Sequence, residues 1–196
     1  MKTNIILSGV GGQGILTIAA VLDTAALDQN LFVKQAEVHG MSQRGGAVQS
    51  HVRISEKEIF SDLIPLGKAD MILSVEPMEL LRYLPYLKSD GWLITDSEPF
   101  INNKNYPEKE TLFNEIESHP NSIIIEATQI AKKIGNSKAA NMVLLGAAST
   151  LIPLSEDSLI ESIKKLFKRK SELIIKLNIE AFNAGKKIAE EKYSFA

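Results

Sequence analysis

Short apolar runs alternate with longer amphipathic stretches along most of the chain. The mostly apolar runs at residues 5–8, 71–75 and 92–95 each end at a glycine or an acidic residue. Runs of this length bounded by turn residues are typical of buried strands. Two longer stretches between these predicted strands, residues 15–27, which are rich in alanine, and residues 78–87, predict helices. Strands that alternate with helices in this way predict an α/β fold.

Residues 47–55 show a different pattern, in which apolar and polar positions alternate. This period predicts a strand with two unlike faces. Residues 56–57 suit a tight turn, and residues 58–62 predict a strand that returns beside the first. Such a hairpin interrupts the strand–helix rhythm, so we expect a mixed sheet. His51 and Arg53 lie on the polar face, where solvent exposure explains them as well as a function does.

The rest of the chain adds strands at residues 31–36 and 122–126 and then becomes helical. Further predicted helices cover residues 111–118, 127–134, 137–151 and 171–192. Ser155 is a predicted N-cap that opens a C-terminal helical segment, residues 155–196. The length suits one domain over residues 1–196. We expect a three-layer α/β/α, Rossmann-like fold with a mixed sheet, a hairpin insertion and C-terminal helices.

Composition excludes several classes of function. Basic and acidic residues number 22 and 24, for a net charge of −2, which argues against a general nucleic-acid or membrane-surface role. The basic run at residues 164–170 is either a solvated face or a docking patch for an acidic partner. The chain has no cysteine, which excludes disulfides, thiolate chemistry and clusters held by its own cysteines. No apolar stretch approaches the roughly 18 residues of a membrane helix, so we expect a cytoplasmic protein.

Residues 9–14 place four glycines between a predicted strand and a predicted helix. This context gives a G-x-G-x-x-G motif its meaning. Gly9 would make the tight turn, Gly11 would open the backbone to a ligand, and Gly14 would let helix and strand pack closely. The free N–H groups at the helix start favour an anion. A ribose-binding acid is not well placed, because Glu37 comes late; a tight turn without a nucleotide remains the alternative.

A second glycine-rich stretch, residues 37–46, follows the strand predicted at residues 31–36. Arg44 offers a planar fork that suits a carboxylate, a phosphate or an acidic group of a partner. Open α/β sheets place their binding crevices in loops beyond the carboxyl ends of strands. The stretch is therefore a functional loop or a polar turn. The candidate ligand- or partner-facing residues of both stretches are Gly9, Gly11, Gly12, Gln13, Gly14, His39, Gly40, Ser42, Gln43, Arg44, Gly45 and Gly46.

The sequence lacks a self-sufficient catalytic set. His39, His51 and His119 are the only histidines, and none has the spacing of a metal motif. Neither a G-x-S-x-G elbow nor a Walker A lysine is present. Glu76 and Asp96, at the ends of neighbouring strands, could pair across a cleft, although acids at such positions commonly cap helices. The inventory suits a subunit that shapes a site whose cofactors lie elsewhere.

Several motifs carry a family resemblance. Residues 9–14 resemble the opening of the gamma-type subunit of the 2-oxoacid:acceptor (ferredoxin) oxidoreductases. Residues 37–53 are similar to the form found in the beta subunit of indolepyruvate:ferredoxin oxidoreductases. Residues 141–146 and 178–185 also resemble family motifs. The resemblance covers essentially the whole chain, so residues 1–196 are identified as a single gamma-type domain.

The resemblance implies a complex that oxidatively decarboxylates an aryl 2-oxoacid, such as indolepyruvate, to its acyl-CoA. Thiamine diphosphate and iron–sulfur clusters would lie in a large, alpha-type partner subunit, and ferredoxin would accept the electrons. The isolated chain would carry no cofactor and would be inactive. Pyruvate or 2-oxoglutarate remains possible as the substrate. A nucleotide- or CoA-binding module, or an assembly subunit without catalysis of its own, is the alternative of another class.

Overall fold

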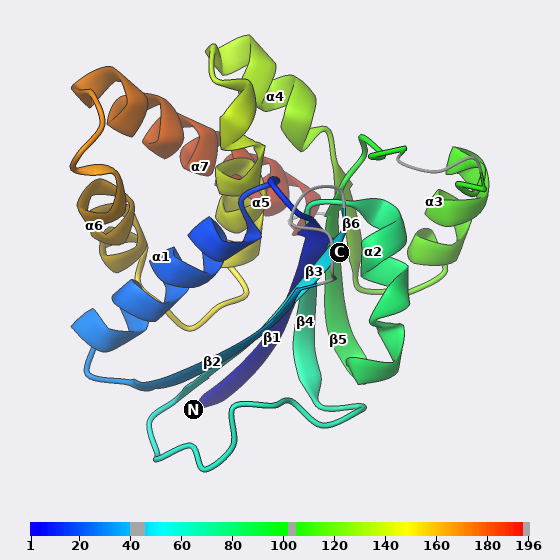
Figure 1. Ribbon diagram of the computed structural model, residues 1–196, viewed down its shortest axis with the longest axis horizontal. Helices are drawn as coiled ribbons and strands as arrows, with labels where there is room; N and C mark the ends of the chain where they lie inside the picture. The colour runs from blue at the N-terminus through cyan, green and yellow to red at the C-terminus, as the bar shows by residue number, and fades with distance from the viewer. Residues whose placement is uncertain (40–45, 102–104, 194–196) are drawn as a thin grey trace.

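The sheet of the computed structural model contains six strands. The structure describes residues 1–39, 46–101 and 105–193. The strands are β1 Lys2–Val10, β2 Phe32–His39, β3 Ala47–Ser55, β4 Ala69–Ser74, β5 Leu87–Asp96 and β6 Ser122–Ile125. Their order across the sheet is β2-β3-β1-β4-β5-β6 (Figure 1). β1, β4, β5 and β6 are parallel, whereas β3 is antiparallel to both β1 and β2. The predicted mixed sheet is confirmed.

The position of the antiparallel strand corrects one prediction. Residues 58–62 form no strand, and they do not return beside β3. β3 lies between β1 and β2, with Thr3 opposite Ile54 on one side and Val33 opposite Ile54 on the other. Both edges of β3 are therefore occupied, so no edge remains for a returning strand. The two antiparallel strands that follow each other in the sequence are β2 and β3, rather than β3 and residues 58–62.

Helices cover both faces of the sheet in three layers. They are α1 Ile15–Asp28, α2 Pro77–Arg82, α3 Lys109–Glu117, α4 Ala127–Ile134, α5 Ala140–Ser149, α6 Glu156–Phe167 and α7 Glu172–Tyr193, with short 3-10 turns η1 Leu84–Tyr86 and η2 Ser137–Ala139. α1, α5, α6 and α7 lie on one face, and α2 and α3 on the other (Figure 1). The three-layer prediction is confirmed. Among the described residues, none of the helices is long and apolar enough to cross a membrane.

The helix predicted at residues 78–87 is shorter than expected. α2 ends at Arg82, a 3-10 turn that contains Pro85 follows, and β5 begins at Leu87. Pro85 lacks the N–H that an α-helix would need there, which explains the early end. The connection between β5 and α3 is described at residues 97–101 and 105–108. Phe100 and Ile101 within it are exposed.

The helical layer around α5 and α7 depends on two glycines. A Cβ atom built on Gly146 would lie 1.9 Å from the carbonyl oxygen of Phe182. A Cβ atom on Gly185 would lie 1.8 Å from the carbonyl oxygen of Val143. Each glycine therefore lets the backbone of the other helix approach at van der Waals distance, which no other residue permits. The motifs at residues 141–146 and 178–185 contain these two contacts.

The opposite face is held by buried polar groups. Arg53 Nη1 donates to the carbonyl oxygens of Ser61 and Leu63 at 2.7 and 2.9 Å. His51 Nδ1 accepts a hydrogen bond from Ile64 N at 3.0 Å. Only 2% of His51 and 7% of Arg53 is exposed, so solvent exposure does not explain either residue. Both fasten the connection between β3 and β4 to the sheet.

Candidate functional site

The helices that follow β1 and β4 lie on opposite faces of the sheet. β1 leads into α1 on one face of the sheet, whereas β4 leads into α2 on the opposite face (Figure 1). The two strands are parallel neighbours, with Ser8 opposite Ser74. Open α/β sheets bind ligands in the crevice that forms where consecutive helices leave in opposite directions. The glycine loop at residues 9–14 lies at this point.

The glycine loop is built into the end of the sheet. A Cβ atom on Gly9 would lie 2.3 Å from Val75 Cγ2, so the loop passes close against the end of β4. Gln13 Oε1 accepts a hydrogen bond from Val10 N at 2.7 Å, which closes the loop on itself. Gly11 N donates to the carbonyl oxygen of Gly46 at 2.9 Å. The Gly11 N–H thus already has a partner within the chain, and the opening of the backbone to a ligand at Gly11 stays a prediction.

Gly14 packs closely against a helix and not against the strand, which was the expected neighbour. It is the N-cap of α1 and has a φ of 82°, which favours glycine. Asn141 Nδ2 donates to the Gly14 carbonyl oxygen at 3.1 Å, and a Cβ atom on Gly14 would lie 2.5 Å from that nitrogen. The close neighbour is thus α5 rather than strand β1. Asn141 is the first motif residue after the 3-10 turn, and it locks the loop to the helical layer.

A groove of about 670 Å³ extends from the glycine loop to the ends of α6 and α7. Gly12 and Gln13 of the glycine loop line it, and so do Asp96, at the end of β5, and Thr128, at the start of α4. Gly12 has a φ of 102° and nothing within 4 Å of a Cβ position, so its backbone faces open space. The groove is thus the concave surface at the topological switch point.

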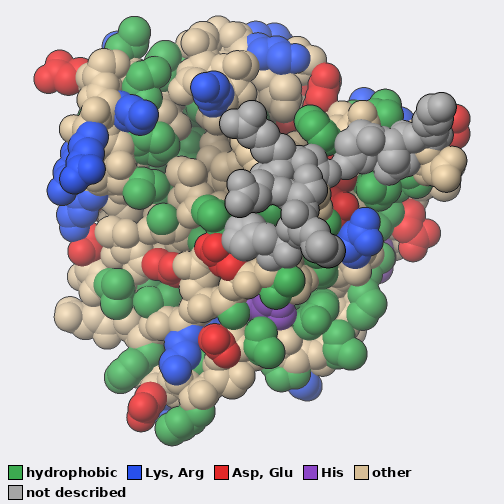
Figure 2. All heavy atoms as spheres, viewed as in Figure 1, with side chains coloured by type: hydrophobic (Ala, Val, Ile, Leu, Met, Phe, Trp, Pro, Cys, Tyr) green, Lys and Arg blue, Asp and Glu red, His purple; other side chains and the backbone are tan. Residues whose placement is uncertain are grey.

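The charge around the groove favours an anionic ligand. Lys138, in the 3-10 turn before α5, and Lys170, in the connection between α6 and α7, both line it. The first turn of α1 has no side-chain cap, so the positive end of its dipole faces the loop. Lys and Arg side chains also gather at the connection between α6 and α7, where Lys168 and Arg169 are exposed (Figure 2). These positive groups outnumber the single acid of the groove, Asp96.

The strand-end acids serve the backbone. Asp96 Oδ2 accepts hydrogen bonds from both the N–H and the hydroxyl of Thr128, which begins α4. Burial raises the pKa of Asp96, although these bonds oppose the shift. Glu76 is the N-cap of α2, and it accepts hydrogen bonds from Glu79 N at 2.8 Å and from the Tyr106 hydroxyl. The capping interpretation is confirmed for Glu76, whereas Asp96 binds the first turn of α4 from outside that helix, whose N-cap is Glu126.

Comparisons with known proteins agree with this architecture. The family model described as pyruvate ferredoxin/flavodoxin oxidoreductase matches residues 4–188. The chain belongs to this family. Indolepyruvate oxidoreductase subunit IorB of Thermococcus kodakarensis is 39% identical over 96% of each chain. The IorB subunit of Archaeoglobus fulgidus is 36% identical over 94% of each chain. A 2-oxoglutarate synthase subunit KorC of Methanothermobacter marburgensis is 32% identical over 97% of this chain and 98% of the other.

Two solved structures show where this fold occurs. The gamma subunit of a keto/oxoacid ferredoxin oxidoreductase from Geobacter sulfurreducens superposes with a TM-score of 0.71 at 26% identity, over 96% of this chain and 99% of the other. A 2-oxoglutarate:ferredoxin oxidoreductase from Magnetococcus marinus gives a TM-score of 0.77 at 23% identity. The match covers 97% of this chain and 31% of that longer one. The fold of this chain therefore occurs both as a separate chain and within a longer one.

The structure places only part of the predicted site of this oxidoreductase-family chain. Gly12, Gln13 and Gly14 line the groove, and Gly9 and Gly11 support the loop behind it. Gly46 is bonded to Gly11, and His39 is the last residue of β2. The candidates outside the described residues are Gly40, Ser42, Gln43, Arg44 and Gly45. Sequence reasoning missed Lys138, and it named Lys170 only as part of the basic run at residues 164–170, whereas the motif at residues 141–146 did indicate Asn141.

The donor set of the chain does not fit the metal cofactors of an oxidoreductase. A cluster held by cysteines needs thiolates, and this sequence contains none. Within residues 1–39, 46–101 and 105–193, His, Asp and Glu side chains form no group of three that could hold a metal ion.

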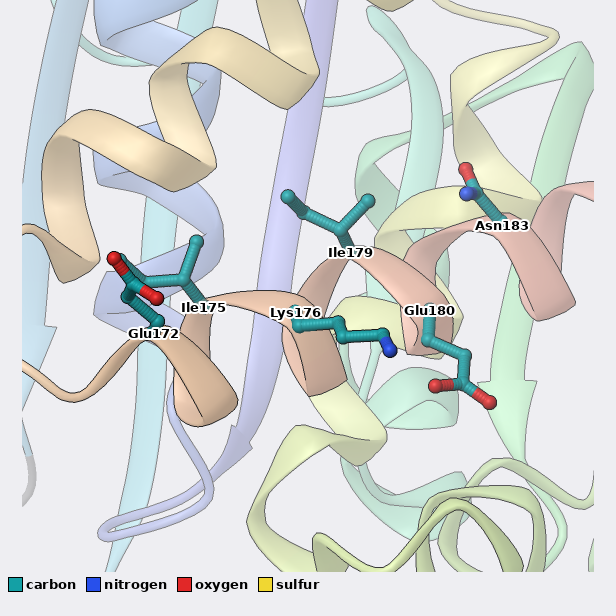
Figure 3. A pocket seen from close by; sticks show the side chains of 6 residues that line it. All are labelled: Glu172, Ile175, Lys176, Ile179, Glu180 and Asn183. Atoms are coloured by element: carbon teal, nitrogen blue, oxygen red, sulfur yellow. The ribbon is translucent and has the colours of Figure 1, made fainter.

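A second hollow, of about 540 Å³, lies along α7 and differs from the groove. It is lined by Glu172, Ile175, Lys176, Ile179, Glu180 and Asn183 (Figure 3). All of these side chains project from one helix, so the hollow is an open helix face rather than an enclosing pocket. A small ligand is usually enclosed from several sides. The groove at the glycine loop is the better candidate site.

Proposed function

We propose that the chain is the small, gamma-type subunit of a ferredoxin-dependent complex that oxidises an aryl 2-oxoacid such as indolepyruvate to its acyl-CoA. Full-length similarity to indolepyruvate oxidoreductase subunits supports the proposal. The two such relatives described above are 39% and 36% identical, against 32% for the 2-oxoglutarate synthase subunit. Residues 1–196 would act as one gamma-type domain in the cytoplasm.

The roles would be divided between two subunits. The large, alpha-type subunit would hold thiamine diphosphate and the iron–sulfur clusters and would pass electrons to ferredoxin. The cysteine-free chain described here would contribute the groove, the glycine loop and the stretch at residues 37–46. His39, Ser42, Gln43 and Arg44 are the residues that we propose to face the partner or the substrate.

Reconstitution tests this function. The chain is co-expressed with the large, alpha-type subunit of its complex, and the purified complex is assayed with CoA and ferredoxin. Indolepyruvate, pyruvate and 2-oxoglutarate are compared by kcat/KM. We expect the highest value with indolepyruvate and no turnover by the small chain alone. A preference for 2-oxoglutarate or pyruvate would reassign the substrate, and full activity of the large subunit without this chain would reduce the chain to an assembly role.

A second candidate function is a CoA-binding module, which the positive groove favours. CoA carries several phosphates, and Lys138, Lys170 and the uncapped start of α1 would face them across the groove. Titration of the isolated chain with CoA, followed by calorimetry, measures this directly. Lys138→Ala should weaken binding, whereas Lys187→Ala on the exposed side of α7 should not. Equal affinities of the two variants would remove the groove from CoA binding.

A further inference from the structure

The two edge strands of the sheet are protected differently. β6 has only four residues, and Lys192 Nζ donates a hydrogen bond to the Ile124 carbonyl oxygen at 3.0 Å. β2 has eight residues and contains neither proline nor glycine. Its register with β3 runs from Phe32 opposite Ser55 to His39 opposite Val48 without a shift. Long, regular edges with free backbone groups are templates for pairing, and natural proteins usually disrupt them.

One face of β2 is also uncovered. Val33 packs against the core under α1, so the residues that alternate with it point to the other face. Phe32 is 49% exposed and Val38 is 50% exposed on that face. The helices of that layer, α2 and α3, lie over β1, β4, β5 and β6 rather than over β2 (Figure 1). Among the described residues, an apolar side chain therefore stands exposed near each end of this edge strand.

The spacing of these two residues is self-complementary. We propose that β2 pairs antiparallel with β2 of a second copy of this chain, about a two-fold axis at Gln35. In that register, residue i lies opposite residue 70 − i of the other copy. Phe32 then lies opposite Val38 of the second copy, and Lys34 lies opposite Ala36. The axis repeats each pair, so both exposed apolar side chains of both copies become covered.

The helical layer leaves room for this approach. α1 contacts β1 and β3 as well as β2, so its axis lies inward from the edge. A two-fold axis perpendicular to the sheet places both copies of α1 on the same side, each over its own strands. The result is a continuous sheet through two chains, held by main-chain hydrogen bonds across β2. The proposal concerns the isolated chain, so it does not depend on the proposed enzymatic function.

A charge exchange tests the pairing and its register. Sedimentation equilibrium of the purified full-length chain should give twice 21.6 kDa as concentration rises. Phe32→Glu alone and Val38→Lys alone should each raise the dimer dissociation constant about tenfold, because each change alters two symmetry-related pairs. The double variant places opposite charges across both pairs, so it should return the dissociation constant toward the original value. Circular dichroism checks that each variant is folded.

A matched control and a cross-link sharpen the result. Leu173→Glu changes an equally exposed apolar residue on α7 and should leave the dimer intact. The sequence has no cysteine, so Phe32→Cys with Val38→Cys introduces the only thiols, and mild oxidation should yield a covalent dimer. A monomer at every concentration would overturn the proposal. So would a dimer that the double variant fails to rescue, or one that Leu173→Glu dissociates. Loss of large-subunit binding by a monomeric Phe32→Glu variant would instead assign the edge to that subunit.

Discussion

The two faces of the sheet are held together by different physical means. On the face of α1, α5, α6 and α7, apolar side chains and close backbone contacts fill the space between helices and strands. On the face of α2 and α3, a smaller apolar cluster is joined by buried histidine, arginine and carboxylate groups. Apolar burial is non-directional, whereas a buried polar group needs a specific partner. Substitutions on the first face should therefore lower stability by disturbing the packing. Substitutions on the second face should lower it by leaving buried hydrogen-bonding groups without partners.

The largest loss of stability should come from a change that disturbs the packing of the helices on the face of α5 and α7. Gly146→Ala places a Cβ atom 1.9 Å from the Phe182 carbonyl oxygen, so the backbones of α5 and α7 must separate. We expect the free energy of unfolding to fall by more than about 3 kcal/mol, measured by urea denaturation. Gly135→Ala is the control, because nothing lies within 4 Å of that Cβ position and only its φ of 95° is strained. Equal losses in both variants would contradict the packing argument.

The difference between the faces also explains what the sequence could predict. The helix at residues 127–134 and the strand at residues 47–55 were predicted with the bounds that the structure shows, because apolar periodicity specified them. The returning strand at residues 58–62 was wrong. Its turn residues suggested a hairpin, whereas the conformation is set by hydrogen bonds to Arg53 and His51 from another strand. Long-range polar bonds leave no local pattern.

The residues of the candidate site also fall into those that a local pattern predicts and those that only the fold brings together. The glycine loop could be found because its motif is local, and Gly12, Gln13 and Gly14 do line the groove. Lys138 could not be found, since a single lysine far along the chain carries no pattern until the fold brings it near. Lys170 ends the basic run at residues 164–170, but nothing in the sequence connects that run with the glycine loop. Asn141 was accessible only through a family motif, because its bond to Gly14 spans 127 positions.

The next largest effect should come from the polar face. Arg53→Met removes the donor to the Ser61 carbonyl oxygen and to Asn4 Oδ1, and it leaves the Leu63 carbonyl oxygen with only the 3.4 Å bond from the Ser61 hydroxyl. We expect a loss of about 2–3 kcal/mol in the free energy of unfolding. Amide hydrogen exchange at Ile64 should also accelerate, because the connection between β3 and β4 is released. Arg169→Met, an exposed change of the same kind, should alter neither quantity. Unchanged exchange at Ile64 would show that apolar contacts hold this connection.

One buried carboxyl on the helical face is an exception to the comparison. Asp23 of α1 has an oxygen, Oδ1, that is buried without a hydrogen-bond partner in the described part of the chain. Burial, and then the nearby charge of Glu37, raises the pKa of Asp23 from 3.8 to about 6. The native state therefore binds this proton more tightly than the unfolded state. The resulting stability is fully present below pH 3.8 and is lost as the pH rises through about 6.

Asp23→Asn should remove this penalty. At pH 7 we expect the variant to be more stable than the original chain by on the order of 1 kcal/mol, after allowance for partial solvent screening. The advantage should shrink as the pH falls from 7 toward 4, because the original carboxyl becomes neutral in the native state. Urea denaturation of both proteins at several pH values measures the difference. A variant that is less stable at pH 7 would mean that the charged carboxylate has a stabilising role.

The smallest effect should come from an exposed cap on the helical face. Ser155 is the N-cap of α6, and its hydroxyl oxygen accepts a hydrogen bond from Ser158 N at 3.3 Å. Ser155→Ala should cost about 0.5–1 kcal/mol, because water can satisfy part of the freed donor. Ser155→Asp should keep the cap and add a favourable charge at the helix start, so its stability should match or exceed that of the original chain. On the polar face, Glu76 caps α2 while fully buried, so Glu76→Ala should cost more than Ser155→Ala. If the two alanine variants lose equal stability, burial does not set the value of a polar group in this chain, and the contrast between the two faces fails.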